Sequence, residues 1–198
     1  LLHEIAATGE TVLDEFEKVA GIRAETAQAM ASAEARHREL LARAQPGDWT
    51  SVGEFVAMLD ELSALRGHLL TIRDYRYVDV ARIDAMEAEL LEAHERVGVA
   101  TGDFLAGPEA LAPFGERLEA LDEAAAHAET AAQLREPLAG METMSGELDT
   151  LSELMASLRV DDATQRTAIV EAISAIYARL NQAKARLEQR RRGMGSAE

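Results

Sequence analysis

A chain of 198 residues in which Ala, Leu, Glu, Arg and Lys make up more than half, with 4% aromatic residues and four prolines, is typical of long helices and coiled coils. This composition disfavours an all-β sandwich or a large α/β enzyme core, and the absence of cysteine excludes disulfides, thiolate metal sites and cysteine nucleophiles. The net charge of −16 opposes binding along a phosphate backbone.

The sequence also predicts where the protein is located and whether the chain is part of a longer one. No uncharged apolar run approaches the roughly 18 residues of a membrane span, and no basic-then-apolar leader is visible. A chain without cysteine fits a reducing compartment, so we expect a cytoplasmic protein without a membrane partner. Because the chain opens at Leu1 without a methionine and stops in a polar helix end, we also expect a piece of a longer protein.

The first predicted helix covers residues 1–45 and ends at Pro46, because proline removes a hydrogen-bond donor and biases its predecessor away from helix. At about 1.5 Å per residue it would be roughly 65 Å long, which predicts an elongated fold. Its 3,4 spacing runs over six heptads, at Leu2, Ile5, Gly9, Val12, Phe16, Val19, Arg23, Thr26, Met30, Ala33, His37, Leu40 and Ala44.

A helical hairpin is predicted over residues 51–105. Its first helix begins at Ser51, which with Glu54 forms a capping box, and its second begins after Asp79, a good N-cap. The turn at residues 72–78 joins them. The two apolar faces are Phe55, Leu59, Leu62 and Leu69, then Ile83, Met86, Leu90, Ala93, Val97, Ala100 and Phe104.

A helical pair is predicted over residues 113–158, starting at Pro113 in a first turn and interrupted or kinked at Pro137. One face is Phe114, Leu118, Leu121, Ala125, Ala128 and Ala132, and the next is Met141, Met144, Leu148, Leu151, Met155 and Leu158. The methionines fit ordinary core better than an adaptable groove.

The last predicted helix, residues 162–192, is basic. Asp162 caps it, with Gln165 in the capping-box position, and Gly193 and Gly195 should fray its end. Its heptad is Ile169, Ile173, Ile176, Leu180, Ala183 and Leu187.

These patterns predict an all-α fold: one elongated segment, residues 1–198, built as an antiparallel coiled coil or helical hairpins of about six helices. An amphipathic helix cannot hide its apolar stripe alone in water, so each helix needs a neighbour. We expect partners from the rest of the parent chain or self-association through the heptad stripes.

Residues suited to catalysis or metal binding are scarce. The phosphate-binding Gly-rich loop is absent, and so is a Gly-x-Ser-x-Gly turn. One Glu-x-x-His turn occurs, Glu34 to His37, whereas a di-metal bundle requires two such turns and two further glutamates, so a solvated pair on a helix is the better interpretation. We therefore expect no catalytic residue, no cofactor and no metal.

Two clusters are candidate interaction residues. Arg186, Arg190, Arg191 and Arg192 form a basic patch, which suits nucleic acid or an acidic partner, or else complements the macrodipole at the helix C-terminus. Tyr75, Arg76 and Tyr77 share one turn, which suits a docking surface or a small core that closes the hairpin tip.

Three stretches carry a family resemblance: Arg66-Gly67 with residues 76–79 and 81–87, then residues 158–167, then residues 173–184. Over about residues 60–198 they resemble the coiled-coil portion of very large bacterial proteins described as DNA repair ATPases, which contain a domain of unknown function and an AAA-type ATPase module. The resemblance implies that the nucleotide site lies elsewhere in the parent chain. It places no ATP-binding residue here.

The leading hypothesis is a non-catalytic coiled-coil arm of a larger cytoplasmic, ATPase-like protein, linked to DNA repair by the resemblance. The alternative is a nucleic-acid-binding helical module that uses the basic last helix. A third hypothesis, a membrane-associated helical polymer, is disfavoured because the first five helices are acidic.

Overall fold

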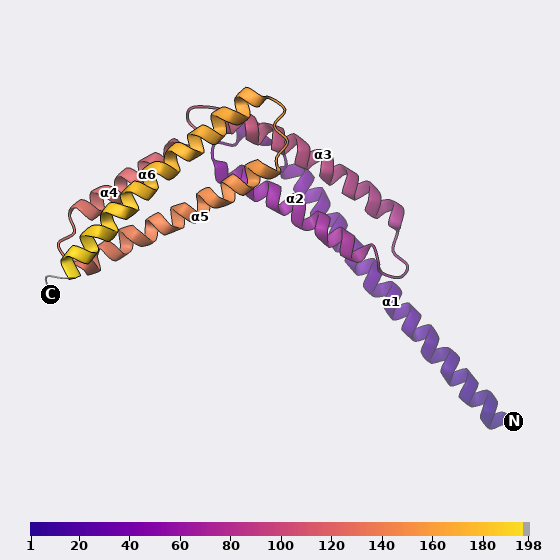
Figure 1. The fold of residues 1–198 in the computed structure, drawn as a ribbon. Helices are drawn as coiled ribbons and strands as arrows, with labels where there is room; N and C mark the ends of the chain where they lie inside the picture. Colours follow the sequence, from indigo (N-terminus) through magenta and orange to yellow (C-terminus); the bar gives the residue numbers. More distant parts are fainter. Residues whose placement is uncertain (196–198) are drawn as a thin grey trace. The chain divides into compact units, whose positions relative to one another are not determined.

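The computed structural model describes residues 1–195, which contain six α-helices, two 3₁₀ turns and no strand. The helices are α1 (Leu2–Arg43), α2 (Val52–Ile72), α3 (Val80–Leu105), α4 (Ala112–Ala126), α5 (Arg135–Ser157) and α6 (Ala163–Gly195), and the 3₁₀ turns are η1 (Pro46–Asp48) and η2 (Ala131–Leu134) (Figure 1). The all-α class is confirmed, while supercoiling of the helices stays a prediction. The last three residues of the predicted 1–198 segment lie outside the described residues.

The predicted capping residues start three of the helices. The backbone N–H of Glu54 donates to Ser51 Oγ at 3.4 Å, and the N–H of Ser51 donates to the Glu54 carboxylate at 3.1 Å. Asp79 and Asp162 accept from backbone N–H groups in the first turns of α3 and α6, at 3.1 and 2.9 Å. Gln165 departs from its expected role, since its side-chain amide donates to Asp103 at 3.0 Å.

The fourth helix is shorter than predicted. It ends at Ala126 rather than near Pro137, and Pro137 lies buried in the first turn of α5. The reason is a second capping box, in which Gln133 N–H donates to Thr130 Oγ1 at 3.4 Å and the Thr130 N–H donates back to Gln133 Oε1 at 3.3 Å. This break shifts the helical phase, so Ala132 is exposed and Leu134 is buried instead.

The sixth helix is longer than predicted. It runs through Gly193 to Gly195 rather than ending at residue 192, so the two glycines are helical and do not fray it. Its six predicted heptad residues are all buried, from Ile169 to Leu187.

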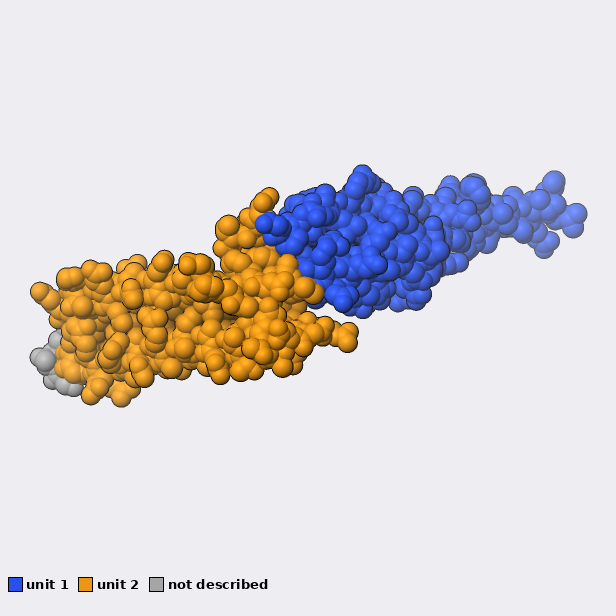
Figure 2. Space-filling model, turned by 90° about the horizontal axis from the view of Figure 1, so that it is seen from above, with its two compact units in different colours: residues 1–47, 57–97 blue, residues 48–56, 98–198 orange. Residues whose placement is uncertain are grey.

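The chain divides into two compact units, which Figure 2 shows in different colours: residues 1–47 with 57–97, and residues 48–56 with 98 onward. In unit 1, α1 packs with α2 and α3. Arg66 of α2 pairs with Glu87 of α3 at 3.3 Å, and Glu34 of α1 pairs with Arg82 of α3 at 3.3 Å. Figure 1 shows that consecutive helices of this unit run antiparallel, so α1 and α3 run in the same direction.

Unit 2 repeats this up-down-up order with α4, α5 and α6. Arg117 of α4 pairs with Glu147 of α5 at 2.6 Å, and Arg186 of α6 pairs with Asp122 of α4 at 3.2 Å. Exposed ion pairs contribute at most about 1 kcal/mol each, so the apolar seams supply most of the stability. The predicted methionine positions are buried core: Met141, Met144 and Met155.

Candidate interaction site

The first half of α1 exposes its apolar face. We call the residues at its heptad positions the α1 stripe: Leu2, Ile5, Gly9, Val12, Phe16 and Val19. Phe16 is 70% exposed, and Ile5 and Val12 are each 63% exposed. Figure 1 shows this half of α1 running on beyond the turn between α2 and α3. The expectation that every stripe has a neighbour is therefore not met within residues 1–195.

The second half of the same helix behaves differently. Thr26, Ala33, His37, Leu40 and Ala44 continue the 3,4 spacing and are all buried in unit 1. A single heptad pattern is thus covered by α2 and α3 over its C-terminal half and uncovered over its N-terminal half.

The boundary between the two halves is the hairpin tip, residues 73–79. Thr26 Oγ1 donates to the carbonyl oxygen of Arg76 at 2.8 Å, and the Arg23 guanidinium lies 4.6 Å from the centre of the Tyr77 ring. The guanidinium of Arg76, the preceding residue, lies 5.4 Å from the centre of the same ring. The hydrogen bond from Thr26 and the cation–π contact of Arg23 fasten the tip to α1, whereas the contact between Arg76 and Tyr77 lies within the tip.

Tyr77 adopts a backbone conformation that is unusual for a bulky residue. Its φ is 67°, in the left-handed region, which costs on the order of 1–3 kcal/mol and persists only where the surroundings hold it. Of the predicted interaction residues, Tyr77 and Arg76 thus close the hairpin tip. Tyr75 is 43% exposed and lies beside a groove.

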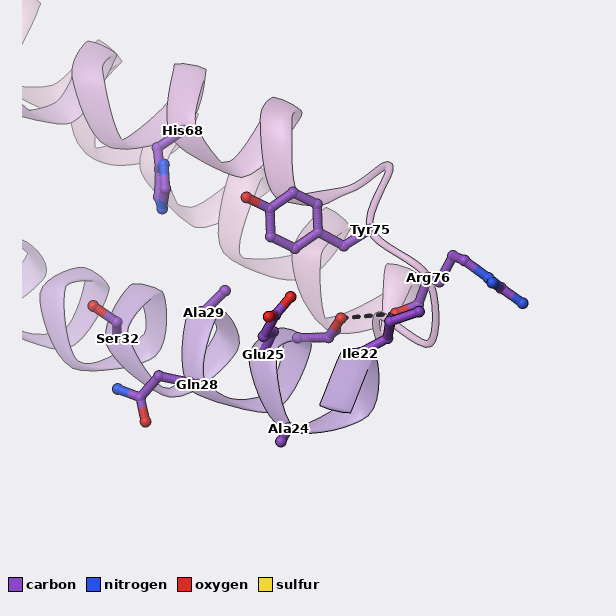
Figure 3. A pocket seen from close by; sticks show the side chains of 10 residues that line it. Ile22, Ala24, Glu25, Gln28, Ala29, Ser32, His68, Tyr75 and Arg76 are labelled. Atoms are coloured by element: carbon purple, nitrogen blue, oxygen red, sulfur yellow. Dashed lines mark hydrogen bonds between the residues drawn. The ribbon is translucent and has the colours of Figure 1, made fainter. Parts of the chain in front are cut away.

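This groove lies between α1 and the end of α2 and has a volume of about 830 Å³. Figure 3 shows the Tyr75 ring leaning over it and the Arg76 side chain pointing away from it. Glu25, Gln28 and Ser32 line it from α1, and His68 lines it from α2. The groove is open and is also lined by the apolar side chains of Ile22, Ala24 and Ala29, which suits contact with a chain segment more than enclosure of a small ligand.

His37 is a buried polar residue in the covered half of the seam. Its Nε2 atom lies 2.9 Å from Glu89 Oε2, an ion-pair distance without hydrogen-bond alignment. Burial lowers the pKa of His37 below its ordinary 6.5 and Arg82 adds to this lowering, while Glu89 and Glu34 oppose it. The Glu34 to His37 turn is therefore not the solvated pair that the sequence suggested.

The predicted basic patch on α6 is largely engaged inside unit 2. The guanidinium of Arg190 donates to the carbonyl oxygens of Ala125 and Ala128, at 2.7 and 3.1 Å, where α4 ends. Arg186 pairs with Asp122 of α4, and Arg191 with Glu188 on its own helix at 2.6 Å. Arg190 thus satisfies the C-terminal carbonyls of a neighbouring helix.

The heptad pattern did not reveal two of the tip's contacts, those made by Arg23 and Thr26. A signal was present, because both, like His37, are polar residues in a heptad whose other positions are apolar or small. Within residues 1–195, no group of three or more His, Asp and Glu side chains is placed to hold a metal ion. In the same range, no helix combines the length and apolar character that crossing a bilayer requires.

Comparison with known families gives one similarity. Residues 109–193 match a domain of unknown function, DUF7902. The matched segment lies within unit 2 and covers α4, η2, α5 and all but the last two residues of α6. No curated protein and no solved structure matches the chain.

The first prediction concerns pH. Since the folded-state pKa of His37 lies below 6.5, neutral His37 contributes its full stability above pH 6.5, and this is lost as the pH falls through the folded-state pKa. Thermal unfolding followed by circular dichroism at pH 7.5 and 5.5 should show a smaller acid-induced drop in Tm for His37→Leu than for the unchanged chain. His68→Leu, at an exposed position, should behave like the unchanged chain, and equal drops in all three would contradict the assignment.

The second prediction concerns Arg190. Removing its two charge-assisted hydrogen bonds with Arg190→Ala should destabilise unit 2 by about 1.5–3 kcal/mol, measured by urea denaturation. Arg191→Ala, which removes one pair within its own helix, should cost only about 0.2–0.5 kcal/mol. Equal effects of the two substitutions would show that Arg190 does not cap α4.

Proposed function

We propose that this chain is a non-catalytic helical arm that connects its parent protein to a partner helix through the α1 stripe. The observation that carries the proposal is the uncovered apolar face at residues 2–19, on a helix whose second half uses the same face as a core seam. An exposed apolar patch of this extent marks an interaction site. An apolar face with this 3,4 spacing is recognised by packing against another helix.

The wider setting of the arm is part of the proposal. We propose that it belongs to a cytoplasmic bacterial protein with an ATPase module and a role in DNA repair. What supports this is the resemblance over residues 60–198, together with the lack of cysteine and the Arg- and Ala-rich composition. A phosphate-binding loop in the sequence that flanks this chain in its parent protein would support the link. ATP hydrolysis by the purified chain would contradict the non-catalytic part.

Nucleic-acid binding through α6 stays a prediction, and it has weaker support. Arg186 and Arg191 pair with carboxylates, and Arg190 is bonded to the carbonyls at the end of α4. Using these arginines on phosphates would mean giving up contacts inside unit 2.

The experiment that tests the arm exploits the absence of cysteine from the chain, because any introduced thiol is unique. Phe16→Cys places it on the α1 stripe, and Ala7→Cys places it on the opposite, outward face of the same helix. In the intact parent protein, maleimide labelling should be at least about tenfold slower at position 16 than at position 7, because a partner helix covers the stripe.

In the isolated chain at high dilution, the two thiols should react at similar rates, since both positions are exposed. Equal labelling in the parent protein as well would contradict the proposal.

A further inference from the structure

We propose that the α1 stripe is occupied by the α1 stripe of a second copy of this chain, paired antiparallel. This inference rests on the proposed function and names the partner of that same surface. Three features of unit 1 carry it: continuity with the buried seam, the steric effect of the hairpin tip, and the distribution of charge along α1.

Continuity comes first. Residues 26–44 of α1 already form a helix–helix seam with α2 and α3, and residues 2–19 extend the same heptad without a change of phase. The natural occupant of such an extension is another heptad helix, which interlocks with it at the same spacing. The stripe is about 27 Å long at 1.5 Å per residue.

The hairpin tip decides the direction. A parallel second copy would carry its own straight α1 past position 19, into the space where the tip docks on Arg23 and Thr26. An antiparallel copy avoids this collision, because its α1 leaves the stripe at the opposite end and carries its own hairpin away from the tip.

The tip also fixes the register. The longest antiparallel pairing that stops short of Arg23 places Leu2 opposite Val19 of the other copy, Ile5 opposite Phe16, and Gly9 opposite Val12. In each of these pairs an a position of one helix faces a d position of the other, as in antiparallel coiled coils. Gly9 leaves room for its neighbours at the centre of the pair.

Charge favours the same occupant. The positions flanking the stripe are almost uncharged: Leu1, Ala6, Thr8, Leu13, Ala20 and one acidic residue, Glu15. In the proposed register Glu15 faces Leu1 and Thr8 of the other copy, so two glutamates do not meet. The remaining acidic residues, Glu4, Glu10, Asp14 and Glu17, lie on the outward face, where they keep the helix soluble without opposing a second copy.

The buried area predicts a reversible dimer. Leu2, Ile5, Val12, Leu13 and Phe16 from each copy supply ten large apolar side chains, each worth roughly 60–120 Å² of buried surface. Their sum, roughly 600–1,200 Å², reaches the lower range of specific interfaces. Association should therefore depend on concentration.

Sedimentation equilibrium of the whole chain tests the dimer. The unchanged chain should shift from monomer to dimer as its concentration rises, and Ile5→Glu should raise the dimer Kd by about tenfold or more, because a charge would enter the apolar seam. Ala7→Glu adds the same charge on the outward face and should leave the Kd within about twofold. Position 5 is exposed in the monomer, so at concentrations where every chain is monomeric the helicity measured by circular dichroism should be the same in both variants and in the unchanged chain.

Disulfide mapping tests the direction and register. After mild oxidation, a mixture of Ile5→Cys and Phe16→Cys chains should form the mixed dimer, because the two positions face each other within the roughly 4.4–6.8 Å that a disulfide spans between Cα atoms. Ile5→Cys alone should cross-link poorly, because its two thiols would lie about 16 Å apart along the axis.

A chain that stays monomeric at all concentrations, or Ile5→Cys chains that cross-link mainly to each other, would overturn the second-copy inference. The proposed function, a helical arm that binds a partner helix, is tested separately by thiol protection in the intact parent protein. A protected position 16 in a chain that does not self-associate would mean that a different helix covers the stripe.

Discussion

An apolar stripe on a helix in water must be covered by another stripe, and this constraint organises both units. In unit 2 it is met by α4, α5 and α6, whose heptad residues bury one another. In unit 1 it is met only where the α2–α3 hairpin lies along α1. An isolated helix of about 20 residues is marginally stable in water, so the residues before the hairpin tip gain most from a partner.

The polar residues within the α1 heptad specify how unit 1 is put together. Thr26 bonds the backbone of the hairpin tip, and Arg23 stacks on Tyr77, so the hairpin stops at one level of α1. His37 meets Glu89 of α3 further along. Apolar heptads alone would tolerate sliding by a turn, whereas the hydrogen bond from Thr26 to the Arg76 carbonyl and the stacking of Arg23 on Tyr77 form at one register. The uncovered length of α1 is thus a consequence of where the tip is fastened.

Local signals in the sequence predicted the helices well, because caps and breakers act over a few residues. Ser51, Asp79, Pro113 and Asp162 all begin helices where expected. The predicted end of α4 was wrong, because the sequence pattern did not separate the Thr130–Gln133 capping box from a run of alanines that fits a helix equally well.

Tertiary roles were beyond the sequence patterns. In the sequence Arg190 is one of several cations at a helix C-terminus. Only the fold shows that it donates to the carbonyl oxygens of Ala125 and Ala128. The pairing order was equally hidden, because heptads of similar composition can accept many neighbours. The exposure of the α1 stripe could not be predicted for the same reason: its spacing is indistinguishable from that of the buried half.

Amide hydrogen exchange along α1 tests most directly whether the stripe is an unsatisfied seam that another helix covers. At low concentration, residues 2–18 should exchange quickly, while residues 26–43, held by α2 and α3, should exchange slowly. As the chain is concentrated, exchange over residues 2–18 should slow markedly and that over residues 26–43 should stay as it was. Rapid exchange of residues 2–18 at every concentration and in the intact parent protein would contradict the account.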